Sequence, residues 1–262
     1  MSGIVIYSSF FPNEEQLFRG IDFLKTMKSH FYDYRIYIGI QVDSIQKWKE
    51  IISDYKENGL DITYGDVNPD LYVNSDVSGY QKALELLYKD NRPIIGDFIW
   101  FGHSKGVTTG RMEHHNFLLE NFWGKKNKIE NDLNQDKKAG CFGNTISFLP
   151  AYDIKKSSDD IFKISKIEKN KNVLRYMFTN TFFVIKNEIF IDFFKNIRIN
   201  FFNELITGHY SIGDRYFFER DFIHFVDILG YYPIFNEVVP NNSWLVSDEN
   251  KIKNEIQLWE KI

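Results

Sequence analysis

The amino-acid sequence predicts an α/β fold with a mostly parallel central sheet flanked by helices. In residues 1–110, short apolar runs alternate with segments of helical periodicity, which is typical of strands joined by crossover helices. The chain has 262 residues, of which 43% are hydrophobic and 26% are charged, so it can bury a sizeable core. Polar turns follow the expected strands, and in α/β proteins such turns are where ligands bind.

The first expected elements are a strand and a helix. The apolar run 4–7 is expected to be a strand. Pro12 and Asn13 then begin a helix, because proline suits a first helical turn. Glu14 and Glu15 lie in that turn, where carboxylates interact favourably with the helix dipole.

The next elements continue the alternation. Residues 34–42 are rich in β-branched and aromatic side chains and predict a strand. A helix is expected at 45–58, closed by Gly59, since glycine commonly ends helices. By the same criteria, further strands are expected at 60–64 and 97–101, with a helix at 80–88 between them.

The second half is less regular and predicts an α+β arrangement. Helices are expected at 114–122, 188–194 and 214–229, and strands at 141–149, 176–185 and 231–239. The stretches 125–138 and 155–172 are rich in lysine and are interpreted as solvated loops or exposed helix ends.

Composition excludes several classes of partner. The formal net charge is −4 and no long basic stripe occurs, which argues against binding to a nucleic-acid polymer. The single cysteine, Cys141, leaves no intrachain disulfide or cysteine-rich zinc site and indicates a reducing, cytoplasmic compartment. No targeting segment is expected, because residues 1–3 lead straight into a strand without a basic region or a long apolar stretch. No transmembrane segment is expected, because the most apolar later window, 176–185, is shorter than the ~20 residues that span a bilayer.

The most informative segment is 96–106, a buried strand that leads into a turn containing His103 and Lys105 between glycines. Glycines let backbone approach a ligand closely, and a lysine is a natural partner for phosphate. We expect this turn to hold the diphosphate of a nucleotide-sugar. The alternative is that Lys105 is a solvated turn lysine.

Four polar turns are expected to share one edge of the sheet: 8–10, 43–44, 74–79 and 102–106. An acidic residue at a strand end can bind the hydrogens of a base or ribose, which suits Asp43 and Asp76; the alternative for each is a helix cap. The candidate donor-binding residues are Ser8, Ser9, Phe10, Asp43, Asp76, Gly79, His103 and Lys105.

In this order, the turns resemble the nucleotide-binding half of glycosyltransferases of the GT-A fold. The resemblance includes Asp43-Ser44, segment 74–79 and Gly-Asp-Phe-Ile-Trp-Phe at 96–101. Where that family has a metal-binding Asp-x-Asp, this chain has His103-Ser104-Lys105.

A bacterial and viral subset of the family carries Phe-His-Thr-Lys-Gly-Val at that place, and segment 101–107 is similar, with one extra glycine. Segment 178–183 resembles the later Phe-x-Gly-Asn-Phe strand of the subset, and Arg215 with Glu219 resembles its Arg-x-x-x-Glu pair.

The resemblance implies a GT-A-like, Rossmann-type fold in one glycosyltransferase domain spanning 1–262. Residues 1–110 would bind the nucleotide-sugar, a UDP- or GDP-sugar, and 111–262 would form the acceptor and catalytic half. The implied reaction transfers a hexosyl or deoxyhexosyl group to a glycan, lipid-linked or protein acceptor.

Transfer with inversion requires a base for the acceptor hydroxyl. Glu219 is the first candidate, Asp221 the second and Asp214 the third; Asp214 could instead cap a helix, and Glu219 could simply pair with Arg215 at i,i+4 spacing. Asn180 and Arg215 are the candidate acceptor-binding residues, although Asn180 is equally consistent with a buried turn residue.

The cationic substitution predicts weak or absent dependence on a divalent metal. Negative charge grows on the leaving diphosphate, and Lys105 with His103 would stabilise it in place of a carboxylate-held ion. The adjacent His114 and His115 would point in different directions on a helix, which argues against a metal site there.

Two other functions compete with this interpretation. A nucleotidyltransferase of similar fold would carry a glycine-rich, arginine-containing loop after the first strand, and segment 8–13 contains neither residue. A non-catalytic carbohydrate- or nucleotide-sugar-binding protein with a degenerate GT-A site is compatible with the missing Asp-x-Asp.

Overall fold

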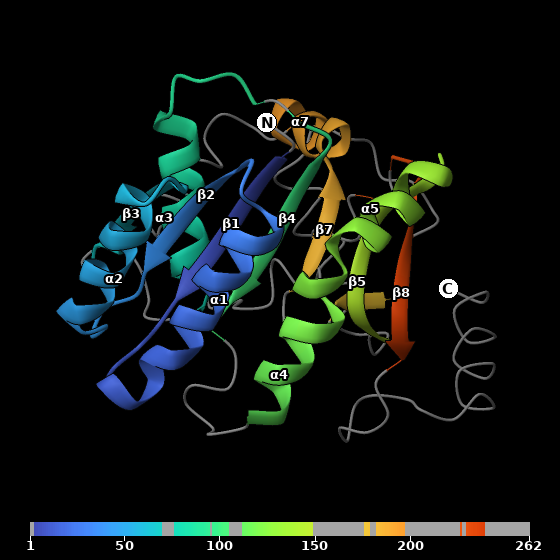
Figure 1. The fold of residues 1–262 in the computed structure, drawn as a ribbon. Coiled ribbons are helices and arrows are strands. Elements are labelled where there is room, and N and C mark those ends of the chain that lie inside the picture. Colours follow the sequence, from blue (N-terminus) through green and yellow to red (C-terminus); the bar gives the residue numbers. More distant parts are fainter. Residues whose placement is uncertain are drawn as a thin grey trace.

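A central β-sheet with helices on both faces forms the core of the chain (Figure 1). A computed structural model describes residues 3–69, 76–94, 96–104, 112–148, 176–178, 182–196, 226 and 229–238. The strands are β1 (Gly3–Ser9), β2 (Tyr34–Ile40), β3 (Asp61–Asp66), β4 (Phe98–His103), β5 (Ala139–Phe148), β6 (Tyr176–Phe178), β7 (Phe183–Lys186) and β8 (Tyr232–Val238). The helices are α1 (Leu17–His30), α2 (Gln46–Glu57), α3 (Asp76–Lys89), α4 (Met112–Asn121), α5 (Lys126–Gln135) and α7 (Asn187–Asn196), with short 3-10 helices η1 (Glu14–Gln16) and η2 (Trp123–Lys125).

The predicted α/β fold with a mostly parallel sheet is confirmed. Within the described ranges the sheet has eight strands in the order β3-β2-β1-β4-β7-β5-β6, and β8 also pairs with β5. Strands β1 to β4 are parallel, and β5 and β8 are parallel to each other. Strand β7 is antiparallel to both β4 and β5, so six of the eight strands, all except β6 and β7, run in one direction.

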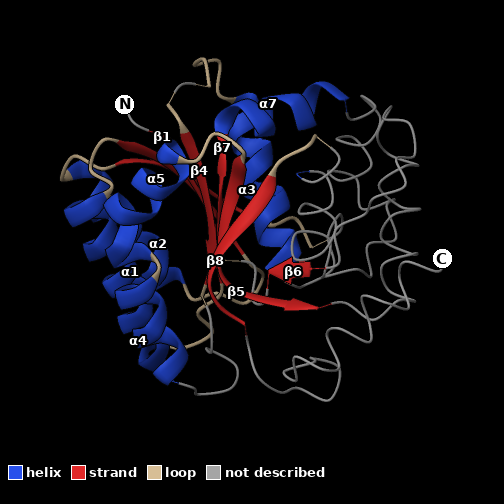
Figure 2. Ribbon diagram, turned by 90° about the vertical axis from the view of Figure 1, so that its right-hand side faces the viewer, coloured by secondary structure: helices blue, strands red, loops and turns tan. Residues whose placement is uncertain are grey.

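Helices cover the two faces of the sheet unequally. Helices α1, α2, α4 and α5 lie on one face, and α3 and α7 lie on the other (Figure 2). Every residue of β1, β2 and β4 is buried, as expected for parallel strands covered on both sides. On the α1 face, Trp100 contacts the rings of Phe31, Phe122 and Trp123, and these aromatic contacts form the centre of the core.

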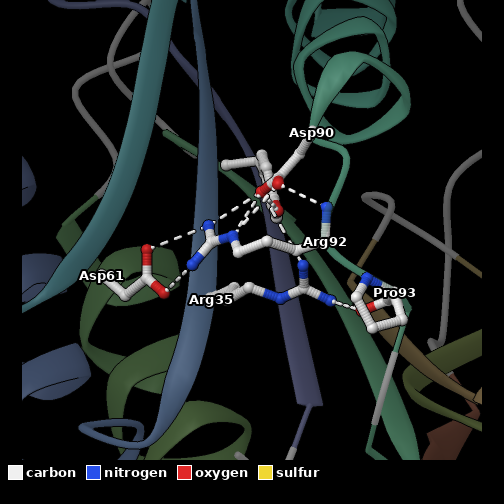
Figure 3. A network of polar contacts seen from close by, with 6 residues as sticks. Arg35, Asp61, Asp90, Arg92 and Pro93 are labelled. Carbon is white, nitrogen blue, oxygen red and sulfur yellow. Dashed lines mark hydrogen bonds and ion pairs between the residues drawn. The ribbon is translucent and has the colours of Figure 1, made fainter.

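A polar network fixes the amino edge of the sheet, opposite the carboxyl ends of the parallel strands (Figure 3). Arg92 donates to the carboxylates of Asp61, the first residue of β3, and Asp90, which directly follows α3. Arg35 of β2 donates to the carbonyl of Pro93 at 2.6 Å. The carboxyl end of α3 is therefore attached to the ends of two strands.

Segment 125–138, predicted as a solvated loop or exposed helix end, instead contains the ordered helix α5. The buried Ile129 and Leu133, four positions apart, face the core. Lys126 is also buried, where its ammonium forms an ion pair with Glu130 at 3.1 Å and lies 4.7 Å from the ring centroid of Tyr34. The lysine-rich composition suggested a solvated segment, but the segment forms a helix in which Lys126 is buried.

Other expected boundaries also differ. The strand predicted at 97–101 continues to His103, because β4 pairs with β1 as far as Ser8. The single strand predicted at 176–185 is divided into β6 and β7, which both pair with β5.

The lysine-rich stretch 155–172 lies outside the described residues, as does most of the helix expected at 214–229. Within the described part of the chain, no helix is long and apolar enough to cross a membrane.

Candidate functional site

The strand order reverses at the pair β1–β4. From β1 the chain continues to β2 on one side of the sheet, and α3 then returns it to β4 on the other side. In open α/β sheets, ligands bind outside the carboxyl ends of the strands at such a reversal, where the two connections diverge. The residues at these ends are Ser8 and Ser9 on β1 and His103 on β4, and the register pairs Ser8 with His103. We refer to this place as the β1–β4 junction.

Two hydrogen bonds join the carboxyl ends of the two strands at the β1–β4 junction. The backbone N–H of Phe10 donates to the hydroxyl of Ser104 at 2.8 Å. The backbone N–H of Ser104 donates to the carbonyl of Ser8 at 3.0 Å. Ser104 thus extends the β1–β4 pairing by one residue beyond the strand and fixes the start of both connecting segments.

The hydroxyls of Ser8 and Ser9 point into the protein. Both residues are fully buried. The side chain of Gln41 donates to Ser8 Oγ at 3.0 Å, and the indole of Trp48 donates to Ser9 Oγ at 3.0 Å. Ser9 Oγ in turn donates to the carbonyl of Gly39 at 3.2 Å. These hydroxyls hold β1 against β2 and α2, so the half-buried Phe10 is the part of the predicted 8–10 turn that is most accessible.

Asp43 lies in the turn after β2 with an exposed side chain and a left-handed backbone, at φ 69°. Such a φ is uncommon outside glycine, although aspartate tolerates it better than most residues. The alternative that Asp43 caps the next helix is wrong, because the residue before α2 is Ile45 and no side chain caps that helix. The hydroxyl of Ser44 has a partner within the protein, since it accepts a hydrogen bond from the backbone N–H of Phe11 at 3.2 Å.

The amino end of α3 packs tightly against the carboxyl ends of β1 and β2. A Cβ atom on Gly39 would lie 1.9 Å from the carbonyl oxygen of Gly79, and one on Gly79 would lie 2.0 Å from Ser8 Oγ. Neither position has room for a side chain, so Gly79 is a packing residue that brings α3 onto the sheet. Asp76 begins α3, and its side chain lies outside the described part of the chain.

His103 is the last residue of β4 and is 4% exposed. It therefore belongs to the strand and not to the turn, contrary to the sequence prediction. Its Nδ1 atom lies 3.1 Å from the hydroxyl of Tyr80 in α3, and its ring centroid lies 4.8 Å from that of Phe182. The preceding Gly102 was expected in the turn but lies in β4. A Cβ atom at this position would lie 2.3 Å from the ring of Trp123, so the strand has room only for glycine here.

Several predicted site residues lie outside the described residues, and their roles stay predictions. They are Lys105, Asn180, Asp214, Arg215, Glu219 and Asp221. Conversely, Gln41, Trp48, Tyr80 and Ser104 shape the junction but were not singled out from the sequence. Gln41 carried a weak signal, since it is the polar residue that ends an apolar run.

The described residues contain no group of three or more histidine, cysteine or acidic side chains that could hold a metal ion. His115 joins α4 to α1, with its Nε2 atom 3.3 Å from a carboxylate oxygen of Asp22. Burial lowers the pKa of His115, and the neighbouring Asp22 only partly opposes this effect. Burial raises the pKa of the Cys141 thiol, because it disfavours the charged thiolate. This buried cysteine is therefore a structural residue of β5.

Comparison with known proteins assigns the chain to no family. No protein-family model matches it, and no curated protein matches it. One similar solved structure is the mannosyltransferase PcManGT from Pyrobaculum calidifontis in complex with GDP-Man and Mn2+, with 10% identity, a TM-score of 0.43, and 92% of this chain and 58% of that chain covered. The chain thus spans less than two thirds of that protein.

Two further solved structures are similar to this chain. The 4-diphosphocytidyl-2C-methyl-D-erythritolsynthase from Anaerococcus prevotii is 11% identical, with a TM-score of 0.39 and coverage of 98% of this chain and 96% of that chain. Core-mannan synthase A from Aspergillus fumigatus, in its Mn/GDP form, is 9% identical, with a TM-score of 0.37 and coverage of 97% and 82%. The fold itself defines the chain as an α/β protein with a mostly parallel sheet, whose strand order reverses at the β1–β4 junction.

Proposed function

We propose that this chain is a glycosyltransferase that uses a nucleoside-diphosphate sugar. The observation that carries the proposal is the β1–β4 junction: the strand order reverses beside His103, directly before the cationic segment that resembles a glycosyltransferase motif. The donor would lie across the carboxyl edge of the sheet. Its nucleoside would lie toward the end of β2, and its diphosphate would lie toward the end of β4.

The chemistry of the edge supports this orientation. The exposed carboxylate of Asp43 follows β2 and can accept hydrogen bonds from a base or ribose. On the other side of the junction, the sequence continues from Ser104 to Lys105 and Gly106, and an ammonium group there would stabilise the leaving diphosphate. His103 would add an N–H donor. Asp76, at the start of α3, is a second candidate for the nucleoside.

The second half of the chain would supply the acceptor side. Glu219 is the proposed base for the acceptor hydroxyl, with Asp221 and Asp214 as the next candidates. Asn180 and Arg215 would contact the acceptor, which would be a glycan, a lipid-linked sugar or a protein. In this arrangement residues 1–110 bind the donor and residues 111–262 bind the acceptor.

The test is calorimetry of the full chain with a panel of UDP- and GDP-sugars, followed by transfer assays with those that bind. Lys105→Ala should weaken donor binding strongly, because a charge-assisted contact to phosphate is lost. Lys47→Ala is the matched control, since Lys47 is exposed and pairs with the exposed Glu50. Absence of binding by every nucleotide-sugar would contradict the proposal. Binding without transfer to any acceptor would favour a non-catalytic nucleotide-sugar-binding protein.

A further inference from the structure

Glu130, a largely buried residue of helix α5, contacts two strands of the sheet. Its carboxylate oxygen Oε1 accepts hydrogen bonds from the hydroxyl of Tyr34 at 2.5 Å and from the indole N–H of Trp100 at 2.9 Å. The other oxygen, Oε2, forms an ion pair with the ammonium of Lys126 at 3.1 Å. We refer to Glu130, Lys126, Tyr34 and Trp100 as the Glu130 cluster.

The fold brings the Glu130 cluster together across β1. Tyr34 is the first residue of β2 and Trp100 lies in β4, and these strands are the two neighbours of β1. Gly3 of β1 is paired with Tyr34, and a Cβ atom on Gly3 would lie 2.3 Å from the ring of Tyr34. The tyrosine ring therefore lies over β1, and Glu130 connects α5 to the strands on both sides of it.

Helix α5 is weakly stabilised by its own sequence. Its buried residues are Lys126, Ile129 and Leu133, and no side chain caps its amino end. Three of its ten residues, at positions 127, 131 and 134, are asparagine, which favours helices only weakly. A helix of this length is marginal by itself, so its contacts with the sheet decide whether it stays in place.

We infer that the Glu130 cluster is a conformational device that fixes α5 in one position on the sheet. Removal of the Glu130 charge then releases α5 locally, while the rest of the sheet stays folded. Apolar side chains such as Ile129 and Leu133 can pack in more than one arrangement, whereas three polar partners around one carboxylate are all satisfied in only one. A shifted α5 would also leave the charge of Lys126, which lies 4.7 Å from the ring centroid of Tyr34, buried and unpaired.

The chain on either side of α5 is held by contacts of its own. Before the helix, the ring of Trp123 stacks on that of Trp100, with 5.8 Å between the centroids. After it, the carboxylate of Asp136 accepts the backbone N–H of Ala139, the first residue of β5, at 3.3 Å. The carbonyl of Asp136 accepts the ammonium of Lys186 in β7 at 3.0 Å. These contacts do not involve Glu130, so they can persist when α5 is released.

Hydrogen exchange of the free protein, followed by mass spectrometry, tests the inference without any ligand. In Glu130→Gln the buried ammonium of Lys126 loses the carboxylate that faces it, and an amide offers the cluster one acceptor oxygen instead of two. We expect the amides of α5 to exchange at least about tenfold faster than in the wild type. The amides of α2 should change by less than about twofold, because release is local.

The matched control lies in the same helix. Lys128 pairs with Asp132 at the same i,i+4 spacing, but its side chain is 66% exposed, whereas that of Lys126 is 9% exposed. Lys128→Met should therefore leave exchange of α5 within about twofold of the wild type. In the double variant Lys126→Met/Glu130→Gln no unpaired charge remains buried, so α5 should exchange more slowly than in Glu130→Gln alone.

Unchanged exchange of α5 in Glu130→Gln would overturn the inference, and so would an equal increase in α5 and α2, because the loss of stability would then be global. Should Glu130→Gln fail to fold, Tyr34→Phe decides. It removes one hydrogen bond but keeps both charges, so α5 should exchange about fivefold faster with α2 unchanged. No change in α5 in Tyr34→Phe would then overturn the inference. No nucleotide-sugar takes part in these measurements, so their outcome is independent of the proposed function.

Discussion

The hydroxyl of Ser104 accepts the backbone N–H of Phe10 at 2.8 Å and joins the segment after β4 to the segment after β1. Ser104 and Phe10 are 94 residues apart in the sequence. The two connections that diverge at the strand-order reversal are therefore linked to each other where they leave the sheet.

Replacing Ser104 by Ala should lower the free energy of unfolding by about 1–3 kcal/mol, because the half-buried N–H of Phe10 would lose its acceptor. Urea denaturation measures the change. Ser29→Ala is the control: its hydroxyl bonds a carbonyl on an exposed helix face, so it should change stability by less than about 0.5 kcal/mol. Equal stability of the two variants would show that the Ser104 bond is dispensable.

Gly79→Ala tests the close packing of α3 on the sheet. Helix propensity alone predicts that this change stabilises the protein by about 1 kcal/mol. We expect the opposite sign, a loss of about 1–3 kcal/mol, because the new Cβ would lie 2.0 Å from Ser8 Oγ. In Gly65→Ala, the control on β3, the nearest atom is the flexible end of Lys82 at 3.0 Å. A stabilised Gly79→Ala protein would mean that α3 lies farther from β1 than described.

Asp90→Asn tests the network at the amino edge. Hydrogen bonds from Arg92 hold the pKa of Asp90 well below its usual range, with a further contribution from Tyr37, although burial opposes the shift. A carboxyl group whose pKa is lower in the folded state stabilises that state above its unfolded pKa. This stability is lost as the pH falls from about 4 toward the folded pKa.

We therefore expect Asp90→Asn to be less stable at pH 7 by roughly 1–2 kcal/mol, a value reduced for screening because Arg92 is 43% exposed. Its stability should also depend less on pH below about 4 than that of the wild type. Urea titrations between neutral and acidic pH measure both effects. Glu50→Gln serves as the control, since it breaks an exposed ion pair with Lys47. Parallel acid profiles for Asp90→Asn and the wild type would contradict the assignment.

Chelation of divalent metal should leave donor binding within about twofold of its original strength, because His103-Ser104-Lys105 stands where metal-binding carboxylates would be expected. Calorimetry with and without EDTA measures this directly. A large loss that manganese restores would show that a metal ion, and not Lys105, stabilises the diphosphate.

Glu219→Gln should reduce the rate of sugar transfer by roughly 10²–10⁴-fold and leave donor affinity unchanged, as expected for removal of a general base. Arg215→Ala distinguishes the competing role, because it would remove one member of the ion pair that the i,i+4 spacing allows and would leave the carboxylate in place. If Arg215→Ala and Glu219→Gln lose only stability, and to the same extent, the two residues form a structural pair.

Local pattern predicted the first half of the fold well. Strands β1, β2 and β4 consist mostly of apolar residues, and the structure buries every residue of each strand. The N-terminal boundary of the first helical segment was also confirmed, since Asn13 caps η1 by accepting the N–H of Gln16. Burial and capping are short-range properties, and sequence patterns report them directly.

The details of the candidate site depend on contacts that no local pattern reveals. A glycine at position 102 is typical of a turn, yet Gly102 lies within β4. Its lack of a side chain leaves room for the ring of Trp123. Ser8 and Ser9 look like ligand-binding hydroxyls, but side chains 33 and 39 residues away, Gln41 and Trp48, bind them. Tertiary packing decided the role of each of these residues.

Helix α3 is anchored at both of its ends. Gly79 holds the first turn against Ser8, and Asp90 attaches the last turn to Arg92. Its 14 residues span about 21 Å, so one rigid rod connects the two rims of the sheet. Substitutions in the polar network at one rim can therefore shift Tyr80, and with it the contact between Tyr80 and His103 at the other rim.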